Sequence, residues 1–88
     1  MAHVLATLKG VKVEDIKQVL EEDALRHAEE GIFLEHLWQN VDDPQQVSFL
    51  FRTADLGHTR QFIERMHAQA REQDAQANLP AMTFLEEK

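Results

Sequence analysis

Histidine is the side chain of this sequence whose ordinary pKa lies nearest to neutral pH. The 88 residues include five histidines but no cysteine and no tyrosine. These counts exclude a thiol nucleophile, a phenolic acid or base, a disulfide and a thiolate metal site. If the protein is an enzyme that needs a general base, we therefore expect that base to be a histidine.

One group of candidate side chains occupies alternate positions from residue 36 to residue 40. His36, Trp38 and Asn40 would share one face of a strand, because side chains alternate along a strand. In a pocket wall, His36 would act as a base or hydrogen-bond partner, Trp38 would stack on a planar ligand and Asn40 would orient an oxygen. A cofactor-free oxygenase needs such a set, since a base forms the substrate anion before oxygen accepts an electron and a donor holds the oxyanion. Alternatively, Trp38 packs at an interface, His36 is an interior or rim histidine, and Asn40 begins a turn.

Two further polar side chains are candidates for a ligand site. His58 falls in the first turn of a predicted helix, where the positive end of the helix dipole favours the neutral imidazole that a base requires. Alternatively, it is a solvent-exposed helix residue. Arg52, the one arginine inside a predicted strand, either pairs with Glu35 across a hairpin or faces an anionic ligand.

Apolar side chains on the second predicted helix are candidates for both core and pocket. Phe62, Ile63 and Met66 follow the three- and four-residue spacing of one helix face. We expect them in the core. If a pocket lies between helix and sheet, Phe62 and Met66 would line it.

No metal or tightly bound cofactor is expected. His3, His27 and His67 have no spacing that brings two ligands to one metal. Glycines occur only at positions 10, 31 and 57, so neither a G-x-G-x-x-G motif nor a P-loop can be assembled. A flavin that diffuses in as a substrate is still compatible with this sequence.

The charge balance argues against nucleic-acid and membrane partners. Nine Lys and Arg residues against sixteen Asp and Glu residues give a net charge of −7, and the basic residues are scattered singly. Such a surface repels a polyanion or an anionic membrane. No apolar run approaches 18 residues. We therefore expect a soluble cytoplasmic protein.

Hydrophobic periodicity predicts six elements that must position these side chains. Strands are predicted over 3–9, 32–41, 46–54 and 81–86, with helices from 13 to about 30 and from 56 to about 74. Gly31 suits the end of the first helix, Pro44 suits a hairpin turn over 42–45, and Asp55 offers an N-cap to the second helix. The order β-α-β-β-α-β predicts an α+β, ferredoxin-like domain with a four-stranded antiparallel sheet, spanning residues 1–88 as one unit.

The predicted hairpin carries large apolar side chains on both faces. Strict alternation would put Ile32, Leu34, His36, Trp38 and Asn40 on one face of its first strand, and the residues between them on the other. Two helices cover only one face of such a sheet, and a monomer seldom exposes a large apolar patch. We therefore predict a two-fold homodimer in which a second copy covers the open face.

The segment WQNVDDPQQVSFLFRTADLGHTRQFIE resembles small dimeric α/β-barrel proteins of the antibiotic biosynthesis monooxygenase-like superfamily. The run 40–44 (NVDDP) matches the hairpin turn of that group, 55–56 (DL) its second-helix entry, and 84–86 (FLE) its closing strand. The resemblance implies two ferredoxin-like sheets that face each other as a homodimeric barrel, with a small pocket in each subunit between sheet and helices. It also implies relatives that include cofactor-free monooxygenases of quinols and polycyclic aromatics, haem-degrading enzymes and isomerases.

Two branches of that superfamily do not transfer to this sequence. The haem-degrading branch draws its Asn, Trp and His from different elements, whereas His36, Trp38 and Asn40 lie on one strand. The aromatic-polyketide branch uses a tyrosine, which this sequence lacks. We therefore expect a binder of a small aromatic or quinone-like ligand. The alternatives are a cofactor-independent monooxygenase or isomerase with a histidine base, and an interaction module without a pocket.

Overall fold

The computed structural model describes residues 2–88 and contains the six predicted elements in the predicted order. Their bounds differ from the expected ones by two residues at most. The strands are β1 (Ala2–Lys9), β2 (Ile32–Gln39), β3 (Gln46–Thr53) and β4 (Ala81–Glu86), and the helices are α1 (Val13–Glu29) and α2 (Leu56–Gln73). Within residues 2–88, no helix has the length and apolar content needed to cross a membrane.

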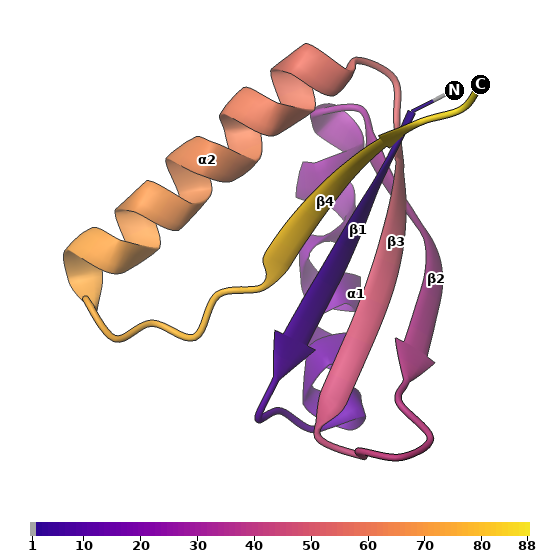
Figure 1. Cartoon of the computed structure of the whole chain (residues 1–88). Coiled ribbons are helices and arrows are strands. Elements are labelled where there is room, and N and C mark those ends of the chain that lie inside the picture. The colour runs from indigo at the N-terminus through magenta and orange to yellow at the C-terminus, as the bar shows by residue number, and fades with distance from the viewer. Residues whose placement is uncertain (1) are drawn as a thin grey trace.

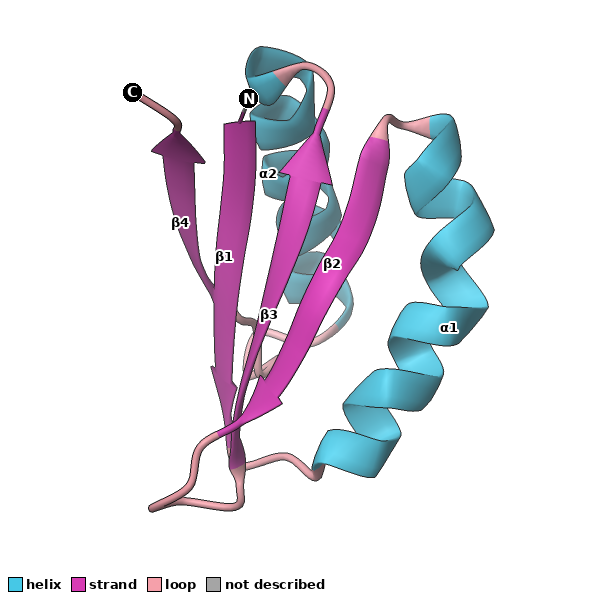
Figure 2. Cartoon of the chain, turned by 90° about the vertical axis from the view of Figure 1, so that its right-hand side faces the viewer, coloured by secondary structure: helices cyan, strands magenta, loops and turns pink. Residues whose placement is uncertain are grey.

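The four strands form one antiparallel sheet in the order β2-β3-β1-β4, which is the ferredoxin-like arrangement. Figure 2 looks onto the uncovered face of this sheet, with α2 behind it and α1 along the β2 side. The chain path in Figure 1 shows α2 leaning away from the sheet at its C-terminal end. One face of the sheet is thus packed against helices, and the other is open.

Strict alternation along the two central strands builds the core. Every second side chain of β1 and β3 points toward the helices and is buried, while the intervening side chains are partly exposed. The buried set on these strands is Val4, Ala6, Leu8, Val47, Phe49, Phe51 and Thr53.

The predicted turn and helix ends are confirmed. The N–H of Gln46 donates to the carbonyl of Asp43 at 3.0 Å, which closes a turn with Pro44 at its second position. Asp55 caps α2, since its Oδ1 accepts from the N–H of His58 at 3.1 Å. Gly31 follows the end of α1 with φ of +73°, a conformation that glycine adopts without strain.

Strict alternation on the second strand is wrong, because β2 contains a β-bulge. Leu34 pairs with Phe51 but His36 pairs with Leu50, so that Glu35 is an extra residue between the two pairs. Paired residues share a face. Leu34 therefore lies on the helix side, whereas His36 and Trp38 lie on the open face. The expected single face from Ile32 to Asn40 is split at Glu35.

Candidate functional site

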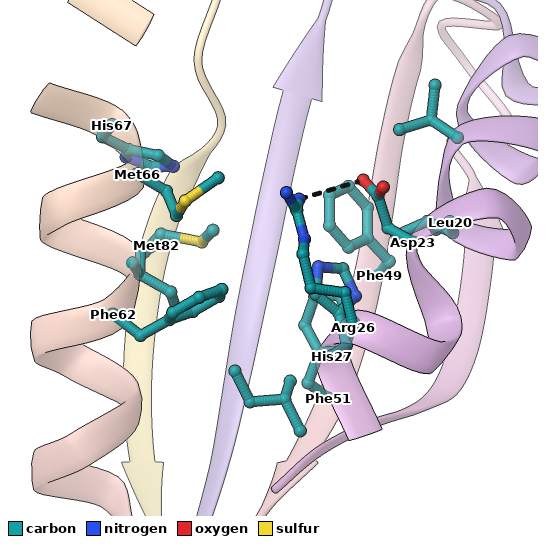
Figure 3. A pocket seen from close by; sticks show the side chains of 13 residues that line it. Leu20, Asp23, Arg26, His27, Phe49, Phe51, Phe62, Met66, His67 and Met82 are labelled. Atoms are coloured by element: carbon teal, nitrogen blue, oxygen red, sulfur yellow. Dashed lines mark ion pairs between the residues drawn. The ribbon is translucent and has the colours of Figure 1, made fainter. Parts of the chain in front are cut away.

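A cavity of about 160 Å³ lies between the two helices on the packed side of the sheet. Figure 3 shows α1 and α2 on opposite sides of this cavity, with side chains from both helices directed into it. Its lining is mainly apolar and includes Leu20 from α1, Phe49 and Phe51 from β3, Phe62 and Met66 from α2, and Met82 from β4.

The sequence builds the floor and one wall of this cavity by simple periodicity. Phe49 and Phe51 are two residues apart on β3, so both face the helices, and their rings meet edge to face with centroids 5.6 Å apart. Phe62 and Met66 are one helical turn apart on α2 and face the same cavity. Because α1 and α2 stand apart, these side chains leave a space between them.

Four polar side chains complete the cavity lining. Asp23 and Arg26 on α1 form an ion pair at 3.5 Å. His27 lies beside them and presents its ring edge to face against Phe51, with centroids 5.5 Å apart and planes at 81°. His67 is contributed by α2 on the opposite side (Figure 3). An apolar cavity with a few polar groups is the usual form of a small-molecule site.

Burial favours the neutral form of both His27 and His67 relative to a histidine in water. Desolvation lowers the pKa of His27 below its ordinary value, and Arg26 lowers it further, while Asp23 acts in the opposite direction. Desolvation also lowers the pKa of His67, with a smaller contribution from Arg71. At neutral pH each imidazole can accept a proton or a hydrogen bond from a ligand.

We expect the protein to lose stability as the pH falls below about 6.5, the ordinary pKa of histidine. The folded-state pKa of both His27 and His67 is lowered, so the unfolded chain binds more protons in the window between the folded and ordinary values. Stability therefore decreases as pH falls through this window. Thermal unfolding measured from pH 8 to pH 5 tests this. The double variant His27→Gln, His67→Gln should show a flatter profile, and an unchanged profile would contradict the assignment.

Two of the seven side chains predicted for the site lie at this cavity. Phe62 and Met66 line it, as expected for a pocket between helix and sheet. His36 and Trp38 lie together on the open sheet face, where their rings stack with centroids 5.0 Å apart and planes at 17°. Arg52 lies on the same open face as these two rings.

Arg52 pairs with Glu35, the interaction considered from the sequence. Its Nε lies 3.7 Å from Glu35 Oε2, and its guanidinium carbon lies 4.7 Å from the centroid of the Phe33 ring. Glu35 also bonds to His3, whose Nε2 lies 2.8 Å from Oε1. The bulge thus directs Glu35 to two basic side chains on the open face.

The other two predicted residues are engaged at the ends of elements. Asn40 Oδ1 accepts from the backbone N–H groups of Asp42 and Asp43 at 2.8 and 3.3 Å, so this side chain organises the hairpin turn. His58 Nε2 lies 2.5 Å from the carboxylate of Glu30, which joins the start of α2 to the end of α1. Neither residue lines the cavity between the helices.

The polar residues of the cavity were not selected from the sequence. His27 falls on the apolar stripe of α1 seven residues after Leu20, and His67 follows Ile63 by one turn. The presence of a histidine on the inward-facing stripe of each helix is the sequence signal that could have identified these polar cavity residues. From the sequence, His27 and His67 are assessed only as metal ligands. Residues 2–88 contain no group of three or more His, Asp or Glu side chains that could hold a metal ion.

No protein-family model matches the sequence, and no curated protein matches it. Among solved structures, the chain is similar to a candidate antibiotic biosynthesis monooxygenase from Deinococcus radiodurans, with a TM-score of 0.64, 16% identity, and coverage of 100% of this chain and 93% of that chain. It is also similar to an uncharacterized NIPSNAP domain protein from Burkholderia xenovorans, with a TM-score of 0.60, 20% identity, and coverage of 100% and 95%. The resemblance to antibiotic biosynthesis monooxygenase-like proteins is thereby confirmed at the level of fold.

Proposed function

We propose that this chain is a homodimeric binder of a small aromatic or quinone-like molecule, held in the cavity between α1, α2 and the sheet. The observation that carries the proposal is a cavity of about 160 Å³ that is rich in aromatic and methionine side chains. Its lining includes two histidines whose pKa values are lowered by burial. Aromatic rings favour edge-to-face contact with Phe, and thioether sulfur contacts ring edges favourably. The imidazoles supply hydrogen-bond partners for a hydroxyl or carbonyl oxygen.

The size of the cavity favours a ligand with one ring. An apolar cavity of about 150 Å³ is large enough to hold benzene. The cavity of this chain is slightly larger, at about 160 Å³, and is lined by Phe49, Phe51 and Phe62. A phenol, hydroquinone or benzoquinone therefore fits by volume, with its oxygen directed to His27 or His67. The same cavity favours a binder over an interaction module without a pocket.

The open sheet face supports the dimeric part of the proposal. Three large side chains on that face are well exposed in the single chain: Trp38 at 47%, Leu85 at 42% and Phe33 at 37%. Leu50 lies at the centre of the same face, paired with Leu5 on one side and His36 on the other. A patch of this kind on all four strands favours a self-complementary partner.

A cofactor-independent monooxygenase is the second candidate, and it is favoured by the two histidines in the cavity lining, which burial holds in the neutral form that can accept a proton. His27 or His67 could take the proton of a hydroquinone, and the resulting anion could reduce O₂. One oxygen atom would enter the ring to give a hydroxyquinone and the other would leave as water, so that hydroquinone and O₂ balance hydroxybenzoquinone and H₂O. His36 and His58 lie outside the cavity, so the base of this reaction would be His27 on α1 or His67 on α2.

We expect hydroquinone to bind at Phe49, Phe62, Met66 and Met82. Titration of the isotope-labelled dimer should shift the backbone and methyl resonances of these residues before others. Met66→Trp should weaken binding about tenfold or more, because the larger side chain fills the cavity. Gln69→Trp places the same side chain at an exposed position of α2 and should leave binding unchanged.

The same titrated samples distinguish the two candidate functions. Oxygen uptake above the rate of hydroquinone autoxidation without protein, measured with an electrode and accompanied by formation of hydroxybenzoquinone, would identify the monooxygenase. Binding without oxygen uptake above that protein-free rate would identify the binder. If hydroquinone shifts no resonance of the cavity at millimolar concentration, the proposed ligand class is wrong.

A further inference from the structure

A depression separate from the cavity lies on the opposite side of the α1 residues that line that cavity. It has a volume of about 250 Å³ and lies between α1 and the β2 edge of the sheet. Its lining includes Ala24 and Glu21 from α1 with Phe33 and Leu34 from β2. Leu34 lies on the helix side of the edge strand β2, just before the β-bulge, and is 44% exposed.

The two spaces are separated by a thin partition of three side chains. Leu20, His27 and Ile32 line both the cavity between the helices and the depression at the β2 edge. Leu20 and Ile32 are core residues with 7% and 3% of their surface exposed. They join α1 to β2 and are needed for packing.

His27 is the member of the partition that packing alone does not explain. It is only partly buried, its neighbours Leu20 and Ile32 are aliphatic, and burial disfavours its protonated form. Figure 3 shows its ring lying against Phe51, across the cavity from Phe62 and Met66. An aliphatic residue would fill the same space without a desolvation cost.

We infer that His27 is a specificity-determining residue that closes the inner end of the ligand cavity and limits its occupant to one aromatic ring. The inference rests on the proposed ligand-binding function, and it explains why the cavity would accept a ligand with one aromatic ring and not two. With the imidazole present, a second fused ring would collide with the partition. Without it, the cavity opens into the depression at the β2 edge, and the second ring can occupy that space beside Ala24.

The experiment compares phenol with 2-naphthol, which carry the same hydroxyl group on one ring and on two fused rings. Binding to the wild-type dimer, His27→Ala and His27→Leu is measured by calorimetry and by 2-naphthol fluorescence, with circular dichroism as the check on folding. His27→Leu keeps a bulky side chain in the partition but removes the imidazole. We expect wild type and His27→Leu to exclude 2-naphthol, and His27→Ala to bind it about tenfold or more tightly than wild type does.

The outcomes separate this inference from the proposed function. If phenol binds wild type but His27→Ala gains no affinity for 2-naphthol, the size limit does not come from His27 and the inference is overturned. It is also overturned if wild type binds 2-naphthol as tightly as phenol. If phenol does not bind wild type, the proposed function itself fails and the inference fails with it. A gain in both His27→Ala and His27→Leu would also overturn the inference, because leucine keeps the bulk of the partition and the second ring would then not be excluded by collision.

Discussion

Leu50→Glu is expected to convert the homodimer that we propose into a monomer. Leu50 lies on a central strand in the middle of the open sheet face, between Leu5 and His36, and it lines a depression there with His3 and Leu85. In a two-fold dimer the substitution buries two unpaired carboxylates, one from each copy. Breaking complementarity in this way costs several kcal/mol, and about 2.7 kcal/mol already weakens dimerisation a hundredfold. Sedimentation velocity at micromolar concentration measures this shift.

Leu25→Glu is the matched control for this experiment. Leu25 is 75% exposed on α1, away from the sheet, so the same substitution there should leave the dimer intact. The new carboxylate lies one turn from Glu21 and Glu29, which costs the helix only about 0.2 to 0.5 kcal/mol per pair. A monomeric wild type, or equal dissociation of both variants, would refute a dimer built on the open face.

The order of elements could be predicted from the sequence because its signals are local. Asp55 at the start of α2, Gly31 after α1 and Pro44 in the hairpin turn each act through their own backbone or the adjacent turn. The β-bulge could not be predicted this way. Glu35 continues the alternation of its strand, and its position as an extra residue is set by pairing with β3 and by contacts to His3 and Arg52. Those partners are distant in sequence.

The part of the candidate site that could be predicted from the sequence is the part that follows a helical period. Phe62 and Met66 were assigned to a helix face that meets the sheet, and they line the cavity. His36 and Trp38 were assigned to a pocket wall, but the bulge shifts them to the open face. The polar part of the cavity depends on how far α1 and α2 stand apart. That separation is a tertiary property, since it follows from packing and not from the spacing of residues within either helix.

Phe51→Ala is expected to destabilise the protein more than any surface substitution considered above. Phe51 is 4% exposed, packs edge to face against both Phe49 and His27, and forms part of the cavity floor. Truncation of a buried Phe to Ala costs about 3 to 5 kcal/mol. A domain of this size has a total stability of only about 4 to 13 kcal/mol, at roughly 0.05 to 0.15 kcal/mol per residue. The variant should therefore be partly or wholly unfolded at 37 °C.

Urea denaturation followed by circular dichroism measures this loss. The protomer concentration is held fixed, because the apparent stability of a homodimer such as we propose depends on it. Phe51→Leu keeps more of the apolar volume and should cost less than Phe51→Ala does, because it leaves a smaller cavity. The difference between the two variants reports on the aromatic floor of the cavity. If Phe51→Ala costs no more than Phe51→Leu, the space left by the ring must collapse around His27, and the cavity is not the rigid site on which the ligand proposal depends.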